Sequence, residues 1–151
     1  KIELANVGLK TMKTAAVASL KAGQTVWFGC DVLRDMSRSE GILATNYFKK
    51  GELFDTKLYL SKADRLSMRE ANVSHAMTLT GVDIIDGKIT KWKVENSWGE
   101  KLGNKGYFVM SDDWFDNYVY EVVVHQDFMD EASKKAANQE KIDLAPWDSL
   151  A

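Results

Sequence analysis

Residues 74–99 constrain the fold more than any other stretch, because two runs of strand-forming residues flank a single Asp-Gly dipeptide. Asp86-Gly87 predicts a two-residue type I′ turn, in which both central residues take positive φ angles. If Ile85 faces Lys88 across this turn, the same register places Met77 opposite Asn96 and His75 opposite Trp98. The stretch is therefore predicted to form a long antiparallel hairpin.

Side chains alternate along a strand, so the predicted register also sorts them between the two faces of the hairpin. Three residues of the first strand share a face with three of the second, and we predict that this face is buried: His75, Met77, Leu79, Val94, Asn96 and Trp98. His75 and Asn96 become diagonal neighbours, with Cβ atoms roughly 5–8 Å apart. An amide in this place can hold an imidazole in one tautomer, as in a Cys-His-Asn catalytic site. A core histidine beside a turn residue is the alternative.

The sequence around these two residues resembles the His and Asn blocks of papain-like cysteine peptidases. The runs are Ser-His-Ala-Met-Thr-Leu-Thr-Gly-Val (74–82), Glu-Asn-Ser-Trp-Gly (95–99) and Gly-Asn-Lys-Gly-Tyr-Phe (103–108). Others resemble the bleomycin hydrolase and aminopeptidase C branch: Val-Trp-Phe-Gly-Cys-Asp-Val (26–32), Ser-Lys-Ala-Asp-Arg-Leu (61–66), Ser-Asp-Asp-Trp-Phe (111–115) and Pro-Trp-Asp-Ser-Leu-Ala (146–151). Together they cover most of the chain but match only the C-terminal portion of that family.

The resemblance implies an α+β fold, the C-terminal β-barrel-like subdomain of a papain-like peptidase with flanking helices. Residues 1–129 are expected to form this subdomain, and 130–151 a polar helix or arm with a C-terminal tail. His75 is then the general base and acid, Asn96 orients it, and Trp98 shields their hydrogen bond from water. The substrate-binding residues implied by the resemblance are Val26, Ala76, Leu150 and Ala151. An ordinary core valine is the alternative for Val26.

The chain contains one cysteine, Cys30, which is a poor candidate for the nucleophile. It lies in a strand-like run and precedes Asp31, whose charge would raise the pKa of a neighbouring thiol. Reactive thiolates instead need a cation or a helix N-terminus. The resemblance places the nucleophilic cysteine and an oxyanion-hole glutamine in an N-terminal portion absent from this chain. A non-catalytic half-fold that binds or packs is therefore the alternative function.

Composition and the resemblance together define the expected partners. Twenty basic and 22 acidic residues give a net charge of −2, which argues against a nucleic-acid-binding protein. No apolar run approaches the roughly 20 residues of a membrane span. A lone cysteine fits a reducing compartment, so we expect a cytoplasmic protein. The resemblance implies peptide substrates, the missing N-terminal portion as partner, a hexameric assembly and no cofactor. Only His75 and His125 are available as histidine ligands, so a metal site is not expected.

The rest of the chain gives local predictions. Apolar residues recur at helical spacing from Leu9 to Leu20, and Gly23 supplies a helix end. Residues 24–32 read as a strand buried on both sides, and 34–60 as loops with short strands. Ser61 and Asp64 predict a capped helix anchored by Leu66. Strands are expected over 107–110 and 118–125, and a solvated helix or extended arm over 130–142. The resemblance implies that the tail ending in Leu150 and Ala151 lies in the active-site cleft, where its terminal carboxylate meets the substrate's amino group.

Overall fold

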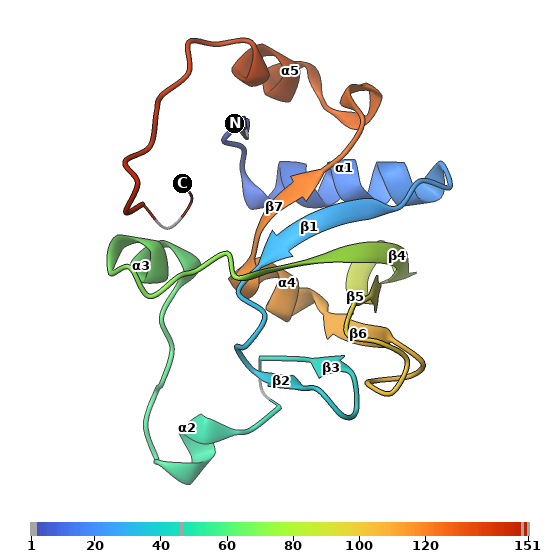
Figure 1. The fold of residues 1–151 in the computed structure, drawn as a ribbon, viewed down its shortest axis with the longest axis vertical. Helices are drawn as coiled ribbons and strands as arrows, with labels where there is room; N and C mark the ends of the chain where they lie inside the picture. Colours follow the sequence, from blue (N-terminus) through green and yellow to red (C-terminus); the bar gives the residue numbers. More distant parts are fainter. Residues whose placement is uncertain (1–2, 46, 149, 151) are drawn as a thin grey trace.

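The computed structural model describes residues 3–45, 47–148 and 150, and a curved mixed sheet is its centre (Figure 1). Its seven strands lie in the order β2-β3-β6-β5-β4-β1-β7, and all neighbours are antiparallel except β3 and β6. The strands are β1 (Val26–Cys30), β2 (Met36–Ser37), β3 (Ile42–Leu43), β4 (His75–Ile85), β5 (Lys88–Glu95), β6 (Tyr107–Ser111) and β7 (Val119–Val123). This architecture confirms the predicted α+β, barrel-like subdomain.

Helices flank the sheet and its connections. They are α1 (Leu9–Lys21), α2 (Lys50–Leu53), α3 (Lys62–Ser67), α4 (Asp112–Tyr118), the 3₁₀ helix η1 (Gln126–Phe128) and α5 (Glu131–Ala137). The long helix α1 ends as predicted, with Gly23 at a φ of 79° just beyond its last turn. Met12 and Ala16 are buried in the core, and Lys13 forms ion pairs with Asp112 and Asp116 of α4. These ion pairs join α1 to α4.

The hairpin β4–β5 forms around the predicted turn, since Asp86 and Gly87 have φ angles of 50° and 75°. Its register is the predicted one at both ends, where Ile85 pairs with Lys88 and Thr78 pairs with Glu95. In the middle the pairing shifts by one residue, because Thr80 is an extra residue on β4 and Thr90 an extra residue on β5. The two bulges compensate each other, and the strand ends that carry His75 and Asn96 keep their relative positions.

One face of the sheet is buried and the other is largely open. The hydrophobic core includes Phe28, Met77, Leu79, Val94 and Phe108, which are almost inaccessible to solvent. Side chains of the opposite face include Trp27 on β1, which is 41% exposed. The prediction of a strand buried on both sides was therefore wrong for β1. Its aromatic content reflects an open sheet face and not a second core layer.

Helix α3 begins as predicted, with a complete capping box between Ser61 and Asp64. Its anchor, however, is Arg65, which is 6% exposed, while Leu66 is only half-buried. The Arg65 guanidinium donates hydrogen bonds to the carbonyls of Leu60 and Asn117. It also lies 4.6 Å from the ring centroid of Tyr118. Carbonyl acceptors and an aromatic face make the burial of this charge tolerable, which an apolar pattern does not reveal.

Two short α-helices were not predicted. Helix α2 follows Lys49, whose φ of 45° starts a single turn with no apolar face. Helix α4 includes Tyr118, which the sequence pattern places in the following strand, so β7 starts at Val119 and ends before His125. Helix α5 is a capped, mostly exposed helix, as expected for the polar segment, with the Asp130 carboxylate accepting from the Ser133 amide. From residue 138 onward the described residues form no further helix or strand.

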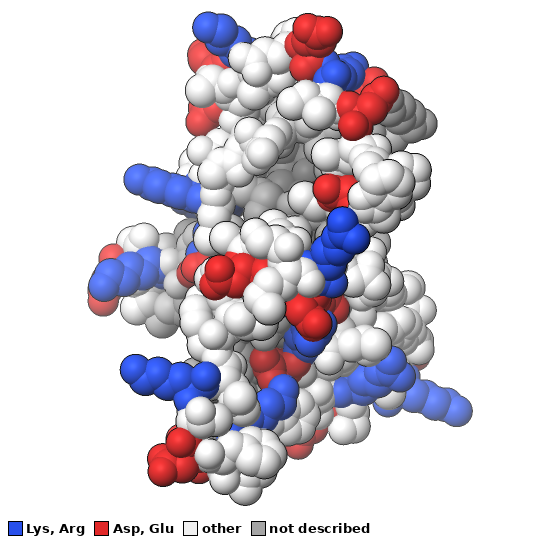
Figure 2. Space-filling view, turned by 90° about the vertical axis from the view of Figure 1, so that its left-hand side faces the viewer, with Lys and Arg blue, Asp and Glu red and all other residues white. Residues whose placement is uncertain are grey.

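The face that carries α2 and α3 shows charges of both signs intermixed, without a large patch of either (Figure 2). This agrees with the nearly balanced count of 20 basic and 22 acidic residues. In the described part of the chain no helix combines the length and the apolar character needed to cross a membrane.

Candidate active site

His75 is the first residue of β4, and the position is fixed by the ladders on both sides of that strand. It pairs with Cys30 of β1, and its half-buried ring reaches toward the residue that follows β5. The imidazole Nε2 lies 2.9 Å from Oδ1 of Asn96. The diagonal contact predicted from the turn register is therefore confirmed.

The orientation of the Asn96 amide determines the tautomer of His75. The backbone N–H of Ser97 donates to Oδ1 of Asn96 at 2.8 Å, so this atom must be the carbonyl oxygen and not the nitrogen. An oxygen acceptor requires Nε2 of His75 to be the proton donor. Nδ1 then carries the lone pair in the neutral ring, and no described residue forms a hydrogen bond with it. Nδ1 of His75 is thus available as a base.

Trp98 covers this hydrogen bond. Its ring centroid lies 4.8 Å from that of His75 at an interplanar angle of 33°. It is itself held by the edge of Phe108, at 6.1 Å, and by the Arg38 guanidinium, at 4.7 Å. The turn after Trp98 returns to the end of β5, because the backbone N–H of Asn96 donates a hydrogen bond to the carbonyl of Gly106. Asn96 is only 7% exposed, so the bond to His75 forms in a dry environment.

Cys30 is close to His75 along the ladder but is not placed to react. Its side chain is completely buried, and the Sγ atom lies 3.6 Å from the backbone carbonyl of His75. Burial raises the pKa of the Cys30 thiol well above its usual range, and the neighbouring Asp31 carboxylate raises it further. The thiol is therefore protonated and inaccessible at neutral pH, in agreement with a structural role.

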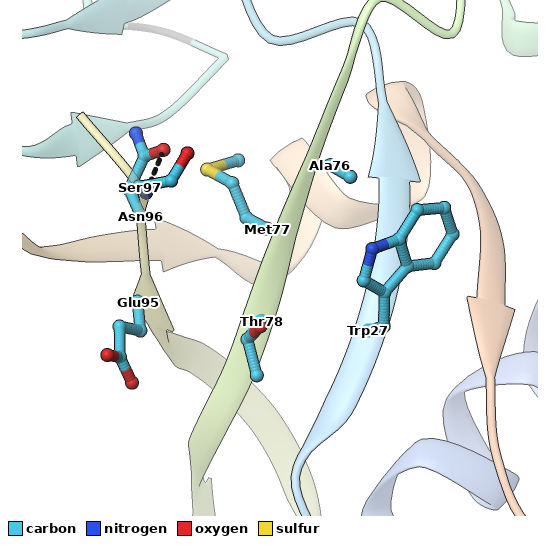
Figure 3. A pocket seen from close by; sticks show the side chains of 7 residues that line it. All are labelled: Trp27, Ala76, Met77, Thr78, Glu95, Asn96 and Ser97. Carbon is cyan, nitrogen blue, oxygen red and sulfur yellow. Dashed lines mark hydrogen bonds between the residues drawn. The ribbon is translucent and has the colours of Figure 1, made fainter.

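A shallow pocket of about 270 Å³ adjoins the site on the open face of the sheet. Figure 3 shows its side chains across β1, β4 and β5, with the Asn96 amide bonded to Ser97 just past the end of β5. The lining residues are Trp27, Ala76, Met77, Thr78, Glu95, Asn96 and Ser97. Ala76 thus faces a hollow next to His75. Val26, in contrast, is fully buried in the core and does not line the pocket, which favours the alternative of an ordinary core valine.

The described tail residues Trp147, Asp148 and Leu150 line a hollow beside α3 and not the pocket beside His75. Leu150 borders a second hollow of about 320 Å³, together with Trp147, Asp148, Leu66, Ser67 and Arg69. Ala151 lies outside the described residues. Residues 68–74 connect α3 directly to His75, so this hollow lies next to the segment that precedes the site.

The two histidines are not brought together. His125 caps η1, and its Nδ1 lies 3.1 Å from a carboxylate oxygen of Asp127 at an exposed position. Across residues 3–45, 47–148 and 150, no group of three or more His, Cys, Asp or Glu side chains is arranged to hold a metal ion.

Comparison with known proteins identifies the family of this chain. The profile described as the Peptidase C1-like family matches residues 1–151. The chain belongs to the Peptidase C1-like family.

Known relatives match nearly the whole length of the chain. It is 54% identical over 146 residues to aminopeptidase G of Lactobacillus delbrueckii subsp. lactis, covering 97% of this chain and 33% of that protein. It is 52% identical over 151 residues to aminopeptidase E of Lactobacillus helveticus, covering 100% of this chain and 34% of that protein. The crystal structure of PepW from Lactobacillus rhamnosis superposes with a TM-score of 0.92 at 50% identity, covering 95% of this chain and 33% of that one. The chain spans about a third of the length of the relatives it matches.

Two residues that shape this Peptidase C1-like site were missed in the sequence. The backbone of Ser97 fixes the amide of Asn96, which any non-proline residue at that position can do, so its identity carries no signal. Arg38 reaches Trp98 from the loop after β2, and no periodic pattern links those two positions. Contacts of this kind between distant loops become visible only in three dimensions.

Proposed function

We propose that this chain supplies the histidine and asparagine half of the catalytic site of a cysteine aminopeptidase. The observation that carries the proposal is the hydrogen bond between Nε2 of His75 and Oδ1 of Asn96, with the amide orientation fixed by Ser97. It leaves Nδ1 as a base on the open side of the site, where a thiol from another segment can approach. The names of the relatives, aminopeptidases G and E, support amino-terminal peptide bonds as the target.

In the proposed reaction Nδ1 of His75 accepts the proton of the incoming thiol, and the thiolate attacks the carbonyl carbon of the scissile bond. A sulfur–carbon bond forms, and the carbon–nitrogen bond breaks as the imidazolium returns its proton to the leaving amine. Water then hydrolyses the thioester, releasing the carboxylic acid and restoring the thiol. Asn96 keeps the ring oriented, and Trp98 keeps water from the Nε2–Oδ1 bond.

The nucleophile and the oxyanion-hole donor come, in this proposal, from a segment outside the 151 residues. Cys30 is the only cysteine in the sequence, and its burial and raised pKa argue against a catalytic role. The same observation favours the alternative, a half-fold that only binds or packs. A hexameric assembly remains part of the proposal through the family resemblance alone.

The test uses the full-length protein encoded by the gene that contains this chain, assayed on aminoacyl amides with free amino groups. We expect hydrolysis by the unmodified protein and by Cys30→Ala, and none detectable for His75→Ala. An inactive full-length protein would support the non-catalytic alternative. Activity that survives His75→Ala but is lost in Cys30→Ala would contradict the assignment of both residues.

We also propose that the tail around Leu150 and Ala151 borders the amino end of the substrate and limits cleavage to the first residue. Support comes from the hollow that Trp147 and Leu150 line together with Leu66 and Ser67 of α3, the helix that precedes His75. Deleting Leu150 and Ala151 from the full-length protein should allow hydrolysis of N-terminally blocked peptides. If the truncated protein still refuses blocked peptides and cuts free-amine substrates as before, the tail does not set specificity.

A further inference from the structure

The short strands β2 and β3 form one edge of the sheet, next to β6 (Figure 1). β3 pairs with β6, and β6 pairs with β5, the strand that Asn96 follows. Arg38 and Gly41 lie in the connection between β2 and β3. The backbone N–H of Val109 on β6 donates to the carbonyl of Gly41 at 2.8 Å. This connection is therefore tied to the part of the sheet that supports the Asn96 side of the site.

The same connection fits closely against residues 99–106, the loop that follows Trp98. The backbone N–H of Gly103 donates to the carbonyl of Arg38 at 3.2 Å. A Cβ atom placed on Gly41 would lie 2.7 Å from Cα of Gly103 and 3.0 Å from the carbonyl oxygen of Tyr107. The two backbones are therefore too close for a side chain to fit between them. The connection thus fixes the far end of the loop.

Trp98 stands at the near end of the loop, and its side chain is held without a hydrogen bond to any described residue. Its ring contacts the imidazole of His75, the ring of Phe108 and the guanidinium of Arg38, which lies 4.7 Å from the ring centroid. Arg38 is exposed and forms no ion pair with a described carboxylate, so none competes with Trp98 for its charge. Arg38 therefore contacts both ends of the loop, through its carbonyl and through its guanidinium.

We propose that Arg38 is a positioning residue, which holds Trp98 over the hydrogen bond between His75 and Asn96 while the imidazole moves protons. The inference rests on the proposed function, because it takes this hydrogen bond as part of the catalytic site. A cation on an aromatic face at an exposed position changes an equilibrium roughly two- to fivefold. Arg38 forms no hydrogen bond with His75 or Asn96, so its effect on the reaction passes through Trp98.

A double-mutant cycle in the full-length protein tests this dependence on Trp98. Its members are the unmodified protein, Arg38→Met, Trp98→Leu and the double variant. Both kcat and KM are measured on an aminoacyl amide. The value of kcat is expressed per active thiol, counted with an irreversible peptide-based alkylator, so that misfolded protein does not enter the rate. Lys101→Met removes an exposed cation of the loop after Trp98 and is the matched control.

We expect Arg38→Met to lower kcat roughly two- to fivefold at nearly constant KM, and Lys101→Met to change neither constant. In the Trp98→Leu background, Arg38→Met should cause no further loss of kcat. An equal loss in both backgrounds, a change confined to KM, or an unchanged kcat in Arg38→Met would each overturn the inference. Any of these results in an active enzyme leaves the proposed function intact, whereas an inactive unmodified protein defeats the proposed function and this inference with it.

Discussion

His75 begins strand β4 and His125 lies just after strand β7, yet their surroundings differ in every respect that matters for chemistry. His75 is half-buried, bonded through Nε2 to Asn96 and covered by Trp98. His125 is exposed, and its nearest ionic neighbour is Asp127, two residues along the chain. One ring is held by residues distant in sequence, the other by its own loop. An imidazole becomes a directed base only where the sheet brings such distant neighbours to it.

The largest expected effect comes from removing the imidazole of His75 itself. His75→Ala should lower kcat/KM of the full-length protein at least about a thousandfold, since it removes the group that moves both protons. His125→Ala is the matched control and should leave kcat/KM within about twofold. Steady-state kinetics on an aminoacyl amide measure both variants. Comparable losses in the two would mean that the surroundings of His75 do not distinguish it.

Removing the orienting group tests how much of the difference depends on Asn96. Asn96→Ala should lower kcat roughly ten- to a hundredfold, because the ring keeps its base but loses the bond that fixes its direction. Asn138→Ala, at the end of α5, is the control for the loss of an amide. Kinetics at saturating substrate separate the effect on kcat from any on KM, and an unchanged kcat would argue against an orienting role.

Replacing the Asn96 amide by a carboxylate extends the comparison of the two histidines to the pH dependence of the rate. Asn96→Asp places a negative charge beside His75, and a nearby carboxylate favours the imidazolium form. The alkaline limb of the pH–rate profile should therefore move to higher pH, making the site resemble the exposed pair of His125 and Asp127 in charge. A profile measured from pH 5 to 10 reports the shift. A limb that moves to lower pH would contradict this reading of the contact.

Shielding is expected to contribute less than orientation. Trp98→Leu should lower kcat several-fold, since it lets water compete for the Nε2–Oδ1 bond while leaving both partners in place. Phe54→Leu, at an exposed aromatic of the loop after α2, should have no effect. A loss as large as that of Asn96→Ala would show that Trp98 positions the ring itself and does more than exclude water.

The smallest expected effect concerns Cys30, which pairs with His75 in the ladder between β1 and β4 but is not expected to be reactive. A thiol whose pKa is raised stays protonated below that pKa, so alkylation should be slow at pH 7 and still slow at pH 9. Mass spectrometry after brief exposure to iodoacetamide, with and without denaturant, measures the labelling. Fast, saturable modification of Cys30 in the folded protein at pH 7 would overturn its structural assignment.

Local rules predicted the parts of the molecule whose geometry depends on neighbours in sequence. Asp86-Gly87 fixed the turn, and the capping box of Ser61 and Asp64 is present as expected. The contact of His75 with Asn96 followed from the turn, but it held only because two unforeseen bulges cancel. The burial of Arg65, the open face of Trp27 and the contact of Arg38 with Trp98 depend on segments far apart in the chain. No periodic pattern encodes such encounters.

The two bulges of the hairpin also determine which insertions and deletions in its strands leave the site intact. Thr80 bonds to the carbonyl of Lys93, and Thr90 bonds to Asp83, so each extra residue is fastened to the opposite strand. Loss of either threonine alone leaves unequal numbers of residues between the turn and the strand ends, which moves His75 one place relative to Asn96 and turns one of them to the other face. Loss of both restores equal numbers. Among relatives that carry this hairpin, insertions and deletions in its middle should therefore occur in matched pairs, one on each strand. A relative with an insertion or deletion on one strand only should have lost the contact between the histidine and the asparagine.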